Sequence, residues 1–212
     1  MADVRDEATI GLRGRGAIVY GYFRRLLSPP LPGDGLLVVG FVEGLIGWPL
    51  SYLLATRPGL APFGVVQSVV VLWLVLTAGI VAVGVVYTAP MVRQKRVWLV
   101  WGVCNGLAAG VNLLWLFGGL PADLARYGLW RPWLAVFGVS YLATAGLEWG
   151  NPQLRVTERA VYALAGVVSL AVLATSFGSG AWLLPRLFLV GGLLHLVPMG
   201  YDVLADVSMV LR

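Results

Sequence analysis

Long uncharged runs of apolar residues constrain this chain more than any other feature. Charged residues make up 12% of the sequence and hydrophobic residues 59%, whereas a soluble domain carries about 25% charged residues. A transmembrane helix needs about 20 consecutive apolar residues, within a range of about 17–25. Six runs meet that requirement, at residues 35–56, 63–87, 97–120, 133–149, 160–184 and 187–206. The sequence therefore predicts an all-α, polytopic membrane bundle of six transmembrane helices.

The residues before the first run have a different character. In the stretch AIVYGYFRRLLS (17–28), apolar side chains recur at helical spacing beside Arg24 and Arg25, which predicts an amphipathic helix on the membrane surface. The stretch SPPLPGDG (28–35) then breaks the helix. We expect residues 1–34 to form a cytoplasmic surface helix with a Pro/Gly linker, and residues 35–212 to form the transmembrane domain.

The basic residues predict the orientation of the bundle. If the six runs alternate in direction, eleven of the 15 basic residues lie on one side of the membrane and four on the other. The larger set is Arg5, Arg13, Arg15, Arg24, Arg25, Arg93, Lys95, Arg96, Arg155, Arg159 and Arg212; the smaller set is Arg57, Arg126, Arg131 and Arg186. The positive-inside rule places the larger set, and with it both termini, in the cytoplasm. We expect a multi-pass protein of the cell membrane.

Ionisable residues inside the runs are the best guide to function. A charged side chain at mid-bilayer costs about 2.5–3.5 kcal/mol on insertion scales, so such residues face protein or a water-filled cavity. From the helical rise per residue, Glu43 and Asn105 lie about 12 Å from the cytoplasmic ends of their runs. Asp202 lies about 6 Å deep and His195 about 16 Å deep. The buried polar groups therefore occupy the cytoplasmic half of the bundle or its midplane.

Four residues of the last run share one helical face. His195, Met199, Asp202 and Asp206 follow one another at helical spacing, and Pro198 favours a kink between them because it removes a backbone hydrogen bond. Asp202 and Asp206 could together bind a divalent cation. His195 and Asp206 are about 16 Å apart along the axis and cannot hold the same ion. Apart from this possible cation, we expect no cofactor.

Acid–base chemistry needs fewer groups than a metal site. A carboxyl group buried among apolar side chains keeps its proton near neutral pH and can act as a general acid. Glu43 and Asp202 are the pair predicted to carry this chemistry, with His195 in support. His195 is also open to a purely structural reading, as a histidine with its hydrogen bonds satisfied in the core.

Two tryptophans do not fit the usual placement at the membrane interface. Trp48 and Trp73 lie inside their runs, whereas interfacial tryptophans gather at the ends. Their ring faces could stabilise a cation. Together with Asn105 and Met199, they are predicted to bind the substrate.

The arrangement of these acidic residues resembles the integral-membrane terpene cyclases. The resemblance rests on Glu43 in VGFVEGLIGWPLSY and Asp202 in MGYDVLADV. It implies a small all-helical protein in which cyclisation of an isoprenoid depends on one acidic residue in an early span and another in the last. The sequence departs from the family pattern in two ways, since that family usually has seven spans and its early glutamate follows a tryptophan rather than Val42.

A row of small residues offers a surface for contact between helices. Gly102, Gly106 and Gly110 form two consecutive GxxxG steps, a spacing that lets helix backbones approach closely in lipid. The spacing fits packing within the bundle, and it equally fits a contact with a second copy or with a protein partner.

Three functions remain open on the sequence alone. The first is a membrane enzyme that uses buried carboxylates on an isoprenoid or lipid-like substrate. The second is a small proton-coupled transporter or channel. The third is a non-catalytic subunit of a larger membrane complex. We expect membrane lipids and a small apolar substrate as partners, and no nucleic acid, since the sequence has no nucleic-acid-binding module.

Overall fold

The computed structural model describes residues 4–125, 128–147, 154–178 and 186–211, and the regular structure within these ranges is helical. The long helices are α1 (Val4–Leu26), α2 (Gly33–Thr56), α3 (Val65–Tyr87), α5 (Arg96–Leu116), α7 (Arg131–Leu147), α8 (Val156–Ser176) and α9 (Leu187–Val210). The short helices are η1 (Pro58–Leu60), α4 (Pro90–Arg93) and α6 (Ala122–Ala125). The predicted helical architecture is confirmed over these residues.

Five helices, α2, α3, α5, α8 and α9, are long and apolar enough to cross a membrane. Between 11% and 39% of the residues in these spans are buried inside the protein, so most of their apolar surface faces outward. Apolar surface of this extent marks a membrane-embedded protein. The remaining predicted span corresponds to α7, which has 17 residues. Arg126 and Arg212 lie outside the described residues.

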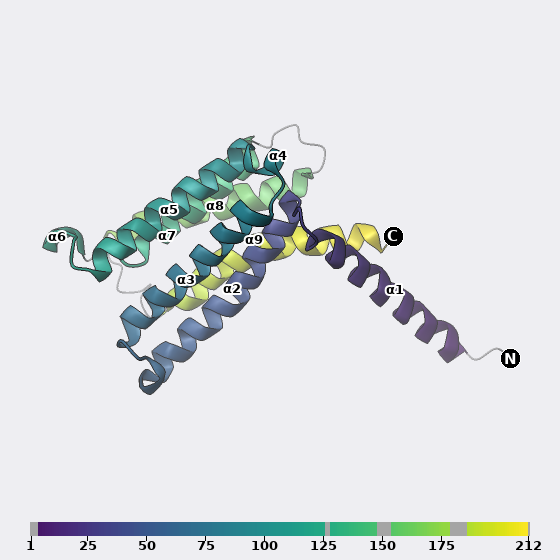
Figure 1. Ribbon diagram of the computed structural model, residues 1–212, viewed down its shortest axis with the longest axis horizontal. Helices are drawn as coiled ribbons and strands as arrows, with labels where there is room; N and C mark the ends of the chain where they lie inside the picture. The colour runs from purple at the N-terminus through teal and green to yellow at the C-terminus, as the bar shows by residue number, and fades with distance from the viewer. Residues whose placement is uncertain (1–3, 126–127, 148–153, 179–185, 212) are drawn as a thin grey trace.

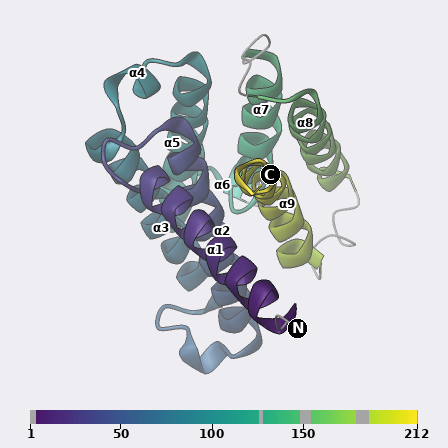
Figure 2. The same cartoon turned by 90° about the vertical axis from the view of Figure 1, so that its right-hand side faces the viewer.

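The helices of the bundle form two groups, which can be followed in Figure 1. In one group α2 packs against α3 and α9, and in the other α7 packs against α5 and α8. The groups meet where α8 contacts α9 and where α3 contacts α5. Figure 2 shows α9 lying between α2 and α3 on one side and α7 and α8 on the other. Helix α1 contacts α9 and α2 and then projects away from the bundle (Figure 1).

Several helices begin or end at residues other than those predicted from hydropathy, because local features of the chain determine these ends. Helix α8 begins at Val156, earlier than the predicted start at 160, because the Glu158 carboxylate accepts from the Arg155 backbone N–H at 2.7 Å and caps its first turn. Helix α5 ends at Leu116 rather than 120, since the chain turns at Gly118, where φ is 70°. Helix α8 ends at Ser176, and residues 179–185 of the predicted fifth span lie outside the described residues. Helix α1 starts at Val4, well before the predicted start at 17.

Two buried tyrosines fix the position of α9 against α7 and α8. Tyr141 and Tyr162 are 0% and 1% exposed, and their ring centroids lie 5.6 Å apart. The Tyr141 hydroxyl donates to the backbone carbonyl of His195 at 3.2 Å, and the Tyr162 hydroxyl donates to Asp202 Oδ2 at 2.9 Å. These contacts hold the polar face of α9 toward the interior of the bundle.

Candidate functional site

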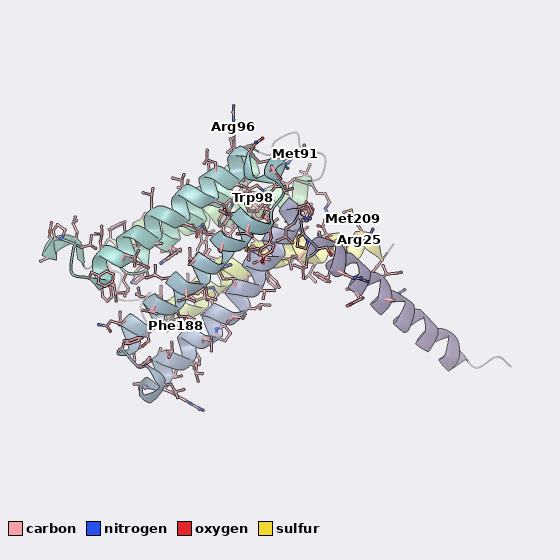
Figure 3. The ribbon with its side chains drawn as sticks, in the orientation of Figure 1. Arg25, Met91, Arg96, Trp98, Phe188 and Met209 are labelled. Atoms are coloured by element: carbon pink, nitrogen blue, oxygen red, sulfur yellow. The ribbon has the colours of Figure 1, made fainter. Side chains whose placement is uncertain are left out.

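A cavity of about 700 Å³ lies between α2, α3, α5, α7 and α9. We call it the main cavity. Its volume falls in the range of about 300–1,000 Å³ that is typical of small-molecule sites. Trp98 and Phe188 both line it, and Figure 3 shows them toward opposite ends of the bundle. The main cavity therefore extends along much of the bundle, which suits a long apolar molecule.

The main cavity reaches the outer surface of the bundle between α3 and α5. Val81 and Val85 of α3, and Leu99 and Val103 of α5, line the cavity and are also exposed. Helices α3 and α5 pack less extensively against each other than against α2 and α7. These exposed side chains are apolar, and they belong to two helices that are long and apolar enough to cross a membrane.

His195 lies between α2, α3 and α7 at the wall of the main cavity. It is 5% exposed, and its ring centroid lies 5.2 Å from that of Phe137 and 6.1 Å from that of Trp73. Its Nε2 atom lies 3.1 Å from the carbonyl oxygen of Gly40. A Cβ on Gly44 would lie 3.1 Å from the same ring, so α2 approaches α9 closely here because both positions are glycine.

Trp48 and Trp73 form an aromatic pair beside His195. Their ring centroids lie 4.8 Å apart. The Trp73 indole N–H donates to Ser51 Oγ at 2.9 Å. The Trp48 ring covers the backbone of α9, and a Cβ on Gly191 would lie 2.1 Å from its Cη2 atom. Two indole faces are thereby fixed at the cavity wall.

Glu43 lines the main cavity from the turn of α2 between Gly40 and Gly44. That turn is also the one that His195 contacts. Across the parts of the chain that the structure describes, no hydrogen bond or ion pair engages the Glu43 carboxyl group. Asn105 lines the cavity from α5 and donates to the carbonyl of Trp101 at 2.8 Å. The main cavity thus holds a carboxyl group among mostly apolar walls.

A second, smaller cavity of about 310 Å³ lies toward the end of the bundle where α1 joins it. We call it the polar cavity. It is lined by Tyr22, Asp34, Lys95, Tyr162, Asp202 and Asp206, among others. Leu37, Trp98 and Trp101 line both cavities and form the wall between them. The polar cavity therefore adjoins the main cavity on the side of α1.

Asp206 is engaged by its neighbours at the rim of the polar cavity. Its Oδ1 accepts from Arg155 Nη2 at 3.0 Å and its Oδ2 accepts from the Tyr22 hydroxyl at 3.0 Å. Arg155 also pairs with Glu158, and the hydrogen bond to that carboxylate raises the pKa of Arg155. Burial, and next the hydrogen bond to Asp206, raise the pKa of the Tyr22 hydroxyl. This network anchors α1 to α9. Figure 3 shows Arg25 and Met209 where the two helices meet.

The structure brings most of the predicted site residues to one cavity. The main cavity is lined by Glu43, Trp48, Trp73, Asn105, His195 and Met199. Asp202 lies in the polar cavity instead, so the predicted pair of Glu43 and Asp202 occupies two adjoining cavities. In the described residues, no group of three or more His, Cys, Asp or Glu side chains converges to hold a metal ion. The cation at Asp202 and Asp206 stays a prediction.

Sequence reasoning missed several residues that shape both cavities. Trp98 and Trp101 separate the two cavities, and Tyr162 holds Asp202. Hydropathy carries no signal for these positions because each is an ordinary residue of an apolar helix. The pairing of Arg155 with Glu158 does have a signal, since a glutamate three residues after the N-cap is placed to accept from the backbone N–H of the N-cap residue.

Comparison with known proteins adds no relative to this description. No protein-family model matches the chain, and no curated protein or solved structure shows a significant match to it.

Proposed function

We propose that this chain is a membrane-embedded enzyme that uses Glu43 for acid–base chemistry on an isoprenoid or lipid-like substrate. The observation that carries the proposal is a carboxyl group without a protein partner in the described residues, set in the wall of a large apolar cavity. An apolar substrate would enter from the bilayer between α3 and α5. Enzyme sites of this kind place a few polar groups in an otherwise apolar pocket.

The proposed chemistry is a proton-initiated rearrangement of the cyclase type. The Glu43 carboxyl group donates its proton to a carbon–carbon double bond, which leaves a carbocation on the substrate and a carboxylate on Glu43. The faces of Trp48 and Trp73 stabilise the cation. Loss of a proton from the rearranged cation returns that proton to Glu43, so substrate and product are isomers. Asp202 is the second acidic residue of this proposal, and it lies in the adjoining polar cavity.

The proposed topology has six transmembrane helices, with α7 as the sixth, and both termini in the cytoplasm. The last turn of α1, helix α4 and the C-terminus lie at one end of the bundle (Figure 1), and η1 and α6 lie at the other. Arg24, Arg25, Lys95 and Arg96 belong to the first end, which fits the positive-inside rule. The site would then be reached from the membrane and exchange protons with the cytoplasmic side.

The test is to identify the lipid that the purified protein retains, and then to follow its conversion. Glu43→Gln keeps the size of the side chain and removes the transferable proton. We expect this variant to retain the lipid while turnover falls at least 100-fold, since general acid catalysis contributes about 10²–10⁴-fold. The matched control is Asp123→Asn, an exposed acidic residue on α6. Turnover by Glu43→Gln at the wild-type rate would contradict the proposal.

A proton-coupled transporter is the second candidate function. Its specific support is the series of polar groups along α9, from His195 in the main cavity to Asp202 and Asp206 in the polar cavity. A transporter would move protons across sealed vesicles together with its cargo, and an enzyme would not. Proton uptake that requires His195 and Asp202, without chemical change of any lipid, would favour transport.

A further inference from the structure

The last turn of α1 is fixed at the end of the bundle where α3 ends. Leu26, in that turn, is buried, and the Tyr22 hydroxyl donates to Asp206 of α9 at 3.0 Å. The linker that follows α1 is tied to α3, since the backbone N–H of Leu31 donates to the carbonyl of Tyr87 at 2.6 Å. Helix α3 is the most apolar of the five candidate spans. Its end therefore indicates the level of the membrane interface, and α1 leaves the bundle at that level.

From this level α1 runs across the bundle rather than along it. Figure 1 shows its axis crossing the direction of α2 and α3 as it leaves them. Residues 14–18 are exposed, and a Cβ at Gly14, Gly16 or Gly21 would meet nothing within 4 Å. No other described part of the chain therefore covers this stretch. A helix that starts at the membrane interface and crosses the spans is placed to lie along the surface of the bilayer.

The exposed part of α1 carries positive charge that the protein does not neutralise. After its first two turns, the helix has four arginines and no acidic residue. Arg15, Arg24 and Arg25 are exposed, and none of these three forms an ion pair with a described residue. Exposed apolar side chains lie between them, among them Ile18 and Tyr20. Arginines interleaved with apolar side chains suit the boundary between lipid phosphate groups and acyl chains.

We propose that α1 lies on the bilayer surface and binds the phosphate groups of anionic phospholipids through Arg15, Arg24 and Arg25. A guanidinium group can hold a phosphate group by two parallel hydrogen bonds. Each basic residue at an anionic membrane surface strengthens attachment about fivefold. Arg96, at the start of α5, is also exposed, and Figure 3 shows it pointing away from the bundle, so it adds to the positive charge at this end.

This inference goes beyond the proposed function, because it concerns a surface outside both cavities. The sequence predicts a surface helix, and the structure adds the level at which that helix leaves the bundle and the exposed arginines that it presents. On the proposed topology the surface is that of the cytoplasmic leaflet, which is rich in anionic lipids. The apolar side chains among the arginines favour a lipid over a nucleic acid or an acidic protein.

The test compares the phospholipids that the full-length protein retains. The protein is reconstituted in vesicles of equal parts phosphatidylcholine and phosphatidylglycerol and extracted in a mild detergent, and native mass spectrometry counts the bound lipids. We expect wild type to enrich phosphatidylglycerol about fivefold or more. The triple variant Arg15→Gln, Arg24→Gln and Arg25→Gln should lose this enrichment. The enrichment by wild type should also fall as salt rises, because salt screens exposed charges.

Two control variants separate the charge of α1 from other causes. Replacing the same three arginines with lysine keeps the charge and loses the paired hydrogen bonds, so we expect the enrichment to stay within about threefold of wild type. Arg57→Gln removes an exposed arginine at the end of α2 that is remote from α1, and it should leave the enrichment unchanged. Retention of the two phospholipids in the supplied proportion by wild type, or an unchanged enrichment in the triple glutamine variant, would overturn the proposal.

A fluorescent label tests the position of α1 separately. Tyr20 is 69% exposed, so Tyr20→Cys in a Cys104→Ser background can carry a fluorophore without disturbing packing. We expect a nitroxide on the lipid headgroup to quench this label in the same vesicles, and to quench it less in the triple glutamine variant. A label that the headgroup nitroxide does not quench would overturn the placement of α1 on the bilayer and leave the helix to a nucleic acid or an acidic protein. Neither result bears on Glu43, whose role is tested by turnover.

Discussion

Buried polar residues differ in how much of their hydrogen-bonding capacity the protein uses. The Asn112 amide group donates to the carbonyls of Gly128 and Leu129 at 2.6 and 2.8 Å, and its oxygen accepts from Trp133 Nε1 at 2.7 Å. It therefore ties α5 to the beginning of α7 and has little capacity left for a ligand. Glu43 also lines the main cavity, but its carboxyl group has no hydrogen-bond partner among the described residues.

We predict that Asn112→Leu destabilises the protein by about 2–4 kcal/mol. The change leaves two carbonyls and an indole N–H buried without partners, and each such group costs about 1–3 kcal/mol. Unfolding of the detergent-solubilised protein by a denaturing detergent measures the loss. The control is Asn105→Leu, which removes a single bond to a carbonyl of its own helix and should cost less than about 1 kcal/mol. Equal losses of stability in Asn112→Leu and Asn105→Leu would contradict the structural role assigned to Asn112.

Glycines distinguish packed helix faces from open ones. On α9, a Cβ at Gly191 would lie 2.1 Å from the Trp48 ring, so this helix and α2 depend on the missing side chain. On α5, a Cβ at Gly102, Gly106 or Gly110 would meet nothing within 4 Å. Among the described residues, this predicted GxxxG face is therefore not a packing surface within the chain. The proposed contact with a second copy or a partner remains a prediction.

We predict that Gly191→Ala destabilises the bundle by about 1–3 kcal/mol and lowers ligand retention, because Trp48 must move to admit the methyl group. Gly106→Ala should change stability by less than about 0.5 kcal/mol, since its methyl group enters open space. Thermal unfolding in one detergent, followed by tryptophan fluorescence, compares the two. A larger loss for Gly106→Ala would show that its face is covered.

At the scale of single helices, the sequence was informative about faces but not about neighbours. It singled out Glu43 and His195 as ionisable residues inside apolar runs and Trp48 as a tryptophan away from the run ends, and all three line the main cavity. The acid–base prediction paired Asp202 with Glu43, because both were expected in the cytoplasmic half of the bundle. The structure places Trp98 and Trp101 of α5 between the two cavities, and such a partition depends on tertiary packing that no local pattern encodes.

The whole molecule joins two helix groups around the main cavity, and its outer surface is apolar. Exposed large side chains such as Leu45, Val75, Leu107 and Leu164 lie on different helices, as is typical of a bundle embedded in a membrane. Hydropathy was sufficient to predict this apolar outer surface, because the hydropathy of a run depends on its composition alone. The short helices η1, α4 and α6 were not predicted, since each is too brief to leave a periodic pattern.

We predict that Ser28 and Leu211 face the cytoplasm and Asp123 the opposite side. Cys104 is the sole cysteine, so Cys104→Ser provides a background for Ser28→Cys, Asp123→Cys and Leu211→Cys. An impermeant thiol reagent applied to intact cells should label the Asp123 position alone. Labelling of the Leu211 position from outside would mean that α7 does not span the membrane and that the bundle has five spans.

The opening between α3 and α5 has a consequence for how this protein would meet its ligand. For a ligand that enters from the bilayer, the concentration that governs binding is its mole fraction among the membrane lipids. Its concentration in water matters only because it determines how much ligand partitions into the bilayer. Acyl chains of the surrounding lipids are always present at the same opening. Binding of the ligand would therefore replace one apolar molecule, a membrane lipid, with another. Selectivity must then come from the few polar atoms on the wall of the main cavity, because every competing lipid is equally hydrophobic along its acyl chains.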